Sequence, residues 1–201
     1  YDKATRRLFL ARDRFGEKPL YYAQCPGGIV FGSDLSAVTS HTNVATDLNI
    51  VGLQKYFAYG FFPAPSTVFK GVRKLPHGHS LKIDALSGEA VAIPYWRYAL
   101  HPDPRPRPEG ELSEELRSLL SSAVEKRLMS DVPIGIFLSG GLDSSAVAAF
   151  AARKIGADRL NTFCLGFDDP SYDESEFARQ MAGVIGCRHF ETNVDLEHAS
   201  E

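Results

Sequence analysis

The residues best suited to chemistry in this sequence are three serines, two glycines and one aspartate in a single heptapeptide. They form the run Ser139-Gly140-Gly141-Leu142-Asp143-Ser144-Ser145. Adjacent glycines allow backbone conformations that a side chain forbids, so successive N–H groups can turn inward on an anion. The serine hydroxyls add donors, and Asp143 is the one group of the run that could hold a divalent cation. The heptapeptide predicts a hollow suited to a phosphate chain.

The flanking residues predict how this hollow is positioned. An apolar run at 134–138 precedes the heptapeptide, and a run of small residues at 146–152 follows it. This order predicts a strand, a tight turn and a helix whose free amides and positive dipole end point into the hollow. The run lacks the lysine of a P-loop and the third glycine of a dinucleotide-binding loop. A plain strand-to-helix turn with Asp143 or Ser144 as N-cap is the structural alternative.

The heptapeptide resembles the pyrophosphate-binding loop of ATP pyrophosphatases, which cleave ATP between its α and β phosphates. Its flanks narrow the resemblance to the glutamine-dependent asparagine synthetase family. The similar segments are 11–22, 127–133, 166–167 and 172–175. The resemblance extends from about residue 8 to about residue 192, nearly the whole chain.

The resemblance implies an α/β protein with two parts. Residues 1–100 look like the C-terminal part of a glutamine amidotransferase domain, an α+β piece of an N-terminal-nucleophile glutaminase sandwich. Residues 111–201 look like the N-terminal part of a parallel-sheet ATP-pyrophosphatase domain of the adenine-nucleotide α-hydrolase type. The alternating prolines of residues 101–110 predict a semi-rigid linker between the two parts.

Residue patterns in the first part favour short strands and turns. Strands are expected at 7–12, 19–24, 29–32, 68–72, 80–83 and 91–96. A short helix is expected at 34–38, and a longer one that Asp47 caps and that ends before Gly60.

The second part alternates helix and strand. Leucines at helical spacing predict a helix from about 111 to about 130. Strands at 134–138, 160–165 and 188–192 then alternate with helices at 143–155 and 174–185, which implies parallel strands.

Two details of these helices are expected from spacing. Val147, Phe150 and Ala151 should face the sheet, and Asp173 with Glu176 should form a capping box. Asp173 and Glu174 resemble family residues beside the site. Because Asp173 is already explained as a cap, neither is assigned a binding role.

The resemblance also implies a reaction. The side-chain carboxylate of aspartate attacks ATP to give β-aspartyl-AMP and pyrophosphate, and ammonia from glutamine then displaces AMP. The partners are therefore the small molecules ATP, aspartate and glutamine or ammonia, with Mg²⁺ neutralising the leaving pyrophosphate. Position by position, the resemblance assigns pyrophosphate to Ser139, Gly140, Gly141, Ser144 and Ser145, Mg²⁺ to Asp143, and adenosine to Leu138 and Leu165.

One family feature has no counterpart, the N-terminal cysteine that serves as glutaminase nucleophile. Residue 1 is Tyr1, and the interleaved Arg12, Asp13 and Arg14 are expected to fix a turn rather than to catalyse. We therefore expect an internal fragment without a catalytic nucleophile, inactive alone, from a longer synthetase that carries the full activity. A homodimeric parent is compatible with the resemblance.

Composition excludes several classes of partner, location and site. With a net charge of −3 over 201 residues and no basic patch, no nucleic-acid partner is expected. There is no apolar run of about 18 residues and no signal peptide, so a cytoplasmic protein without a membrane span is expected. Three widely spaced cysteines, Cys25, Cys164 and Cys187, suggest neither a disulfide framework nor a zinc site.

Two other functions remain open. A sibling amidotransferase or a β-lactam-synthetase-like enzyme would adenylate a different carboxylate. A non-catalytic nucleotide-binding module would keep the loop without the chemistry.

Overall fold

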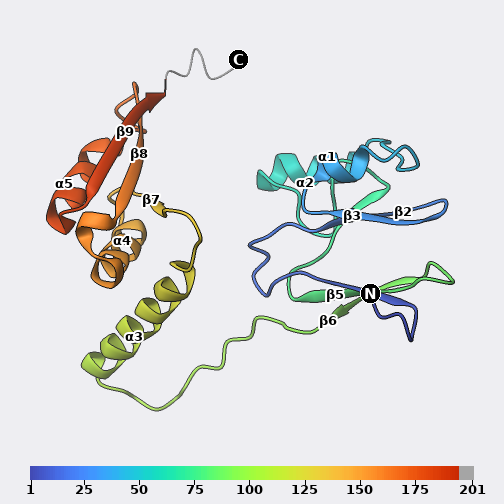
Figure 1. The fold of residues 1–201 in the computed structure, drawn as a ribbon, viewed down its shortest axis with the longest axis horizontal. Coiled ribbons are helices and arrows are strands. Elements are labelled where there is room, and N and C mark those ends of the chain that lie inside the picture. Colours follow the sequence, from blue (N-terminus) through green and yellow to red (C-terminus); the bar gives the residue numbers. More distant parts are fainter. Residues whose placement is uncertain (195–201) are drawn as a thin grey trace. The chain divides into compact units, whose positions relative to one another are not determined.

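The computed structural model describes residues 1–194. The chain forms two compact units that divide between Pro102 and Asp103, and each is described by itself. The described residues form a mixed α/β protein with three small sheets (Figure 1). Residues 195–201, the end of the predicted 111–201 domain, lie outside the described residues.

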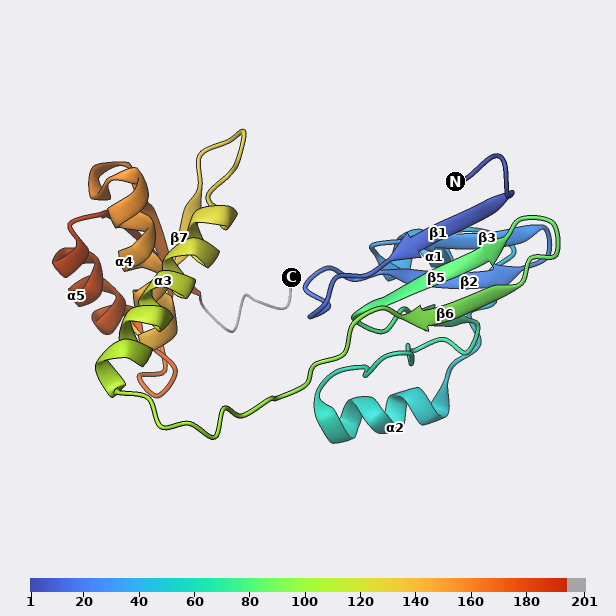
Figure 2. The same ribbon diagram turned by 90° about the horizontal axis from the view of Figure 1, so that it is seen from below.

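The first unit contains two antiparallel sheets of three strands. One has the order β1–β5–β6 and consists of Arg7–Ala11, His79–Asp84 and Ala90–Pro94. The other has the order β3–β2–β4 and consists of Gly28–Gly32, Tyr21–Cys25 and Val72–Lys74. The two sheets of this unit form two layers in Figure 1, and their strands overlap in the turned view of Figure 2. Side chains from both sheets form one buried cluster. That cluster contains Tyr22, Leu75, Leu81 and Ile83.

Two helices accompany the second sheet. Helix α1, Leu35–Thr39, buries Val38 with Ala23 and Val72 of that sheet. Asp34 caps it by accepting a hydrogen bond from the Ser36 N–H at 2.8 Å. The short helix predicted at 34–38 is thus confirmed within one residue at each end.

Helix α2, Ile50–Tyr59, ends as predicted but begins later. Gly60 ends it with a left-handed φ of +75°. The predicted Asp47 cap is wrong, because Asn49 caps the helix and accepts from the Gly52 N–H at 3.0 Å. Residues 47–49 instead pair with 68–70 in extended backbone, which delays the helix. The same pairing leaves β4 only at Val72–Lys74, later than the predicted strand at 68–72.

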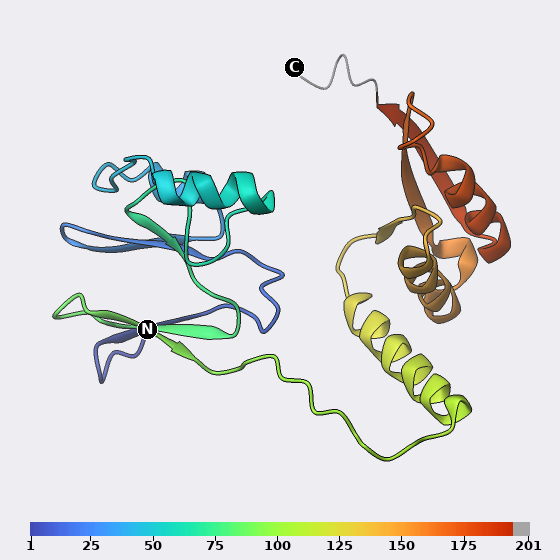
Figure 3. The ribbon, with the colours of Figure 1, turned by 180° about the vertical axis from the view of Figure 1, so that it is seen from behind.

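The second unit is a three-stranded sheet with helices. Its strands run parallel in the order β7–β8–β9 (Figure 3). Phe137, Phe163 and Phe190 are in register across the three strands. The elements in chain order are α3 (Glu109–Arg127), β7 (Gly135–Phe137), α4 (Leu142–Ile155), a 3₁₀ turn at Ala157–Arg159, β8 (Asn161–Phe167), α5 (Ser175–Ile185) and β9 (Arg188–Val194).

One face of this sheet packs against α4 and α5 through small residues, which let the helix backbones approach closely. The buried cluster contains Leu138, Ala148, Ala151, Leu160, Cys164, Ala178 and Ala182. The expectation that Val147 faces the sheet is wrong. Val147 is 40% exposed and Ala148 is buried instead. The expectation holds for Ala151, which is buried, and for Phe150, which packs against the same cluster. On α3 only the C-terminal part packs, with Val124 buried and Leu119 62% exposed.

No helix within residues 1–194 combines the length and the apolar character needed to cross a lipid bilayer.

Candidate functional site

The heptapeptide 139–145 lies between the carboxyl end of β7 and the first turn of α4. Leu138 is buried and donates its N–H to the Phe163 carbonyl at 2.8 Å, which continues the pairing of β7 with β8 up to the turn. Gly140 has a left-handed φ of +76°, and Gly141 is the extended N-cap residue of α4. The conformation at Gly140 disfavours a residue with a side chain, so this glycine determines the path of the turn.

Hydroxyl groups tie the turn together. The Oγ atoms of Ser139 and Ser144 lie 2.9 Å apart. Ser139 Oγ also accepts from the Gly141 N–H at 3.3 Å, and Ser144 Oγ from the Ser139 N–H at 3.3 Å. These weak, partly exposed bonds can be exchanged for bonds to a ligand, because hydroxyl hydrogens rotate.

Four backbone N–H groups of the loop have no acceptor among the described residues, those of Gly140, Leu142, Asp143 and Ser144. Only at Ser145 does the helical pattern begin, with a bond to the Gly141 carbonyl at 3.0 Å. Unpaired amides at a helix N-terminus carry the positive end of the helix dipole. The loop can therefore bind an anion through its backbone.

The cap expected in the structural alternative, Asp143 or Ser144, is wrong. Gly141 is the N-cap residue and no side chain caps α4. Asp143 is exposed, and its carboxylate has no hydrogen-bond or ion-pair partner within residues 1–194. Ser145 is buried and its hydroxyl is without a hydrogen-bond partner there. Asp143 is thus free for a ligand.

A pocket of about 330 Å³ borders the loop at the carboxyl edge of β7 and β8. Its lining residues are Phe137, Leu138, Ser139, Phe163, Cys164, Leu165, Phe167 and Glu174. The pocket brings together Leu138, Ser139 and Leu165, which the sequence placed on separate elements. Its walls are apolar and aromatic except at Ser139, Cys164 and Glu174.

Several pocket residues were not singled out from the sequence. Phe163, Leu165 and Phe167 alternate along β8, and this period of two is the signal that could have placed all three on one face. Phe163 and Phe190 stack on that face with ring centroids 5.3 Å apart. Glu174 was linked to the site only by its resemblance to family residues and was assigned no role; its place at the pocket depends on the path of residues 168–174.

Helix α5 supports the loop from the other side. A Cβ atom on Gly140 would lie 2.5 Å from the Cβ atom of Phe177 and 2.7 Å from the backbone nitrogen of Ala178. The loop therefore fits against the first turn of α5 only because residue 140 is a glycine.

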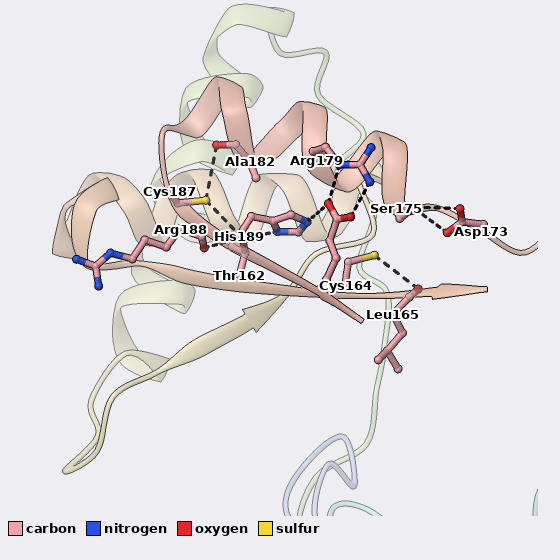
Figure 4. Close-up of polar contacts among 11 residues, drawn as sticks. Thr162, Cys164, Leu165, Asp173, Ser175, Arg179, Ala182, Cys187, Arg188 and His189 are labelled. Carbon is pink, nitrogen blue, oxygen red and sulfur yellow. Dashed lines mark hydrogen bonds and ion pairs between the residues drawn. The ribbon is translucent and has the colours of Figure 1, made fainter. Parts of the chain in front are cut away.

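A polar network attaches α5 to the strands beneath it (Figure 4). The Thr162 hydroxyl lies 2.8 Å from Nδ1 of His189, and Nε2 of His189 lies 3.3 Å from the Glu191 carboxylate. Arg179 of α5 donates two hydrogen bonds to Glu191, at 2.9 and 2.6 Å. These bonds lower the pKa of Glu191 below its ordinary value, because the guanidinium stabilises the carboxylate.

The start of α5 differs from the predicted capping box. Asp173 accepts from the Ser175 N–H at 3.1 Å and from the Ser175 hydroxyl at 2.9 Å, so it does cap the turn. Glu176 does not reach back, because its carboxylate accepts from Gln180 at 3.2 Å instead. Glu174 occupies the N-cap position, without a side-chain cap bond.

Within residues 1–194 there is no group of three or more His, Cys, Asp or Glu residues that could hold a metal ion. Mg²⁺ is usually held by one or two carboxylates together with water and substrate phosphates. The free Asp143 carboxylate could supply the carboxylate ligand, and the free amides beside it could hold the phosphates that supply the others.

The run Arg12-Asp13-Arg14 is structural at its first two positions, as expected. The Arg12 guanidinium donates to the carbonyls of Lys18, Leu75 and Gly16 at 2.9, 2.8 and 2.8 Å. Asp13 accepts from the N–H groups of Glu17 and Lys18 at 2.9 and 3.0 Å. These bonds lower the pKa of Asp13, because they stabilise its charged form.

Comparisons with known proteins relate both units to described families. A family model described as asparagine synthase matches residues 115–201, and one described as glutamine amidotransferase domain matches residues 1–96. Two Bacillus subtilis relatives, glutamine-hydrolysing asparagine synthetases 3 and 1, are 34% and 30% identical to the chain over 204 and 197 residues. These alignments cover 94% and 98% of this chain, and 32% and 30% of the relatives.

A third relative has a different name. The Penicillium rubens protein named amidase chyE is 32% identical over 208 residues, which is 92% of this chain and 29% of that protein. The chain spans about a third of the length of the curated relatives it matches. The two family models together match both units, and the chain belongs to the asparagine synthetase family.

Proposed function

We propose that residues 139–145 bind the pyrophosphate part of ATP in an enzyme that makes asparagine from aspartate with glutamine as amide donor. The observation that carries this proposal is the set of four free backbone amides beside an apolar pocket. A loop that holds the β and γ phosphates as one leaving unit exposes the α-phosphorus to a carboxylate nucleophile. The products of that step are an acyl-adenylate and pyrophosphate.

Five residues of the loop would share one role. Ser139, Gly140, Gly141, Ser144 and Ser145 would hold the pyrophosphate through the three hydroxyls, the free amides of Gly140 and Ser144, and the Gly141 amide once it leaves Ser139 Oγ. Ser145 is the least accessible of these, since it is buried.

Leu138 and Leu165 would contact the adenosine, because both line the pocket that borders Ser139. Asp143 would hold Mg²⁺, which supplies positive charge to the leaving pyrophosphate when bound.

The two units would belong to two domains with different functions. Residues 1–100 would belong to the glutamine-hydrolysing domain, residues 101–110 would be a linker, and residues 111–201 would begin the ATP-dependent domain. We assign no catalytic nucleophile to residues 1–201. The 201-residue piece by itself is expected to make no asparagine.

Exchange of radioactive pyrophosphate into ATP tests the proposal in the full-length protein. The exchange should require aspartate and Mg²⁺, and the Asp143→Ala variant should lose it. The matched control is Asp158→Ala, an exposed aspartate in the same unit but outside the loop. A full-length protein that binds ATP but shows no aspartate-dependent exchange would contradict the reaction and favour a non-catalytic nucleotide-binding module.

A second candidate differs only in the carboxylate that is activated. The relative named as an amidase motivates it, because sequences of this similarity carry more than one enzyme name. Exchange that another carboxylic acid supports better than aspartate would favour an amidotransferase or a β-lactam-synthetase-like enzyme.

A further inference from the structure

Three acidic residues at the start of α5 differ in what their carboxylates bind. Asp173 is occupied by the N–H and the hydroxyl of Ser175, which lower its pKa. Glu176 is occupied by Gln180. The Glu174 carboxylate has no hydrogen-bond or ion-pair partner among the described residues, so it is the one left free for a ligand.

The backbone of Glu174 is nonetheless well fixed. Its carbonyl accepts from the Ala178 N–H at 3.1 Å, and the bonds between Asp173 and Ser175 hold the residues on either side (Figure 4). The Glu174 side chain is exposed, so the fixed backbone limits the entropy cost of binding to the ordering of one side chain.

Among residues 1–194, Glu174 is also the one charged residue that lines the 330 Å³ pocket beside Ser139. The surfaces of Phe137, Phe163 and Phe167 in this pocket suit the flat face of a base. A carboxylate repels phosphate, so Glu174 suits the nucleoside side of the pocket and the loop amides suit the phosphate side.

The ribose lies between base and phosphates in a ribonucleotide, and its neighbouring 2′- and 3′-hydroxyls are both donors. Parallel sheets that bind dinucleotides use two separate groups for these two parts of the ligand. The N-terminus of the first helix binds the pyrophosphate, and an acidic residue further along the chain binds the ribose hydroxyls. Here α4 follows β7, and Glu174 follows β8, the adjacent strand.

We propose that Glu174 accepts hydrogen bonds from the ribose hydroxyls of the bound nucleotide and makes the site selective for ribonucleotides. This inference rests on the proposed function, because it takes the loop 139–145 as the phosphate site. Glu174 then acts in substrate specificity, separately from pyrophosphate release.

Equilibrium binding of ATP and 2′-deoxy-ATP to the full-length protein tests the proposal. A hydrogen bond to a charged group predicts that the wild type binds ATP about ten- to a hundredfold more tightly than 2′-deoxy-ATP. Glu174→Ala should weaken ATP binding toward the level of 2′-deoxy-ATP and leave the binding of 2′-deoxy-ATP much less changed. Glu176→Ala, a matched loss of an acid two residues along α5, should keep the wild-type ratio.

Other outcomes overturn the proposal. If Glu174→Ala lowers the affinity for ATP and for 2′-deoxy-ATP equally, or lowers neither, a ribose contact is excluded. A loss for ATP without a loss for inosine triphosphate, which lacks the adenine amino group, assigns the carboxylate to the base. Glu174→Gln keeps the shape of the side chain, so an unchanged ratio in this variant with an unchanged unfolding temperature also counts against a charged contact.

Failure of the proposed function can be told apart from these outcomes, because the wild-type protein alone would reveal it. A wild-type protein that binds neither ATP nor pyrophosphate contradicts the phosphate site itself.

Discussion

Gly140 and Phe177 lie so close that a Cβ atom on the glycine would be 2.5 Å from the Cβ atom of the phenylalanine. The two residues are 37 positions apart, on the loop before α4 and on the first turn of α5. The position of the candidate phosphate-binding loop is therefore set by a second helix as well as by its own glycines.

Gly140→Ala should destabilise the protein more than a left-handed alanine alone does. The left-handed conformation costs about 1–2 kcal/mol, and the overlap with α5 adds to this. Gly186→Ala is the matched control, since Gly186 has a φ of +77° but no atom within 4 Å of its added Cβ. Urea unfolding should rank Gly140→Ala as the less stable variant, and equal losses would contradict the close contact.

Asp143→Asn should leave the fold intact and remove the dependence of pyrophosphate exchange on Mg²⁺. The Asp143 side chain is exposed and has no partner among the described residues, so the unfolding temperature of the variant should stay at the wild-type value. Exchange should fall by at least about tenfold, because metal neutralisation of a leaving group supplies several kcal/mol. Wild-type exchange rates and a wild-type Mg²⁺ titration in this variant would assign the metal elsewhere.

Arg12→Lys should lower the free energy of unfolding of the first unit. The guanidinium donates to three carbonyls in different directions, which a single ammonium group cannot reproduce. We expect a loss of about 1–3 kcal/mol, because partly buried carbonyls lose their donors. Arg14→Lys in the same loop has no described side-chain bond to lose and should be neutral. Equal behaviour of the two variants in thermal unfolding would show that Arg12 does not fix the loop.

The Arg179–Glu191 pair should make the second unit sensitive to acid. Because the pKa of Glu191 is lowered in the folded state, its contribution is present above its unfolded pKa and is lost as the pH falls through the folded value. The difference in unfolding free energy between wild type and Glu191→Gln should be constant from neutral pH down to about pH 5 and should shrink below that. Glu114→Gln, which breaks the more exposed pair with Arg117 on α3, should show a smaller difference.

Cys164 should react slowly with thiol reagents although it lines the pocket. Burial raises the pKa of its thiol, and the nearby carboxylate of Glu191 raises it further, so little thiolate is present at neutral pH. Peptide mass spectrometry after brief iodoacetamide treatment should find Cys25 and Cys187, which are partly exposed, labelled before Cys164. Labelling of Cys164 first would indicate an activated thiol and reopen its assignment as a buried structural residue.

Local signals account for much of what could be predicted. The heptapeptide lies between a strand and a helix, Gly60 ends α2, and Asp34 caps α1, because these features depend on residues within one turn of the chain. The alternation of helix and strand in residues 109–194 also follows from local periodicity. Family membership was reached from short motifs for the same reason, since the loop chemistry lies in contiguous residues.

Contacts between distant segments decided the features that could not be predicted from the sequence. Asp47 and Asn49 are both good cap residues, and pairing with residues 68–70 decided between them. Val147 and Ala148 are both apolar, and the close approach of α4 to the sheet selected the alanine.

The same distinction applies to the candidate site. By itself, the sequence determined which residues could bind a phosphate chain, because backbone freedom and hydroxyl donors belong to the heptapeptide. The tertiary structure alone decided that α5 closes against Gly140, and that Glu174 reaches the pocket with a free carboxylate. The physical reason is that unpaired groups and close approaches depend on every neighbour in space, and those neighbours come from strands and helices far apart in the chain.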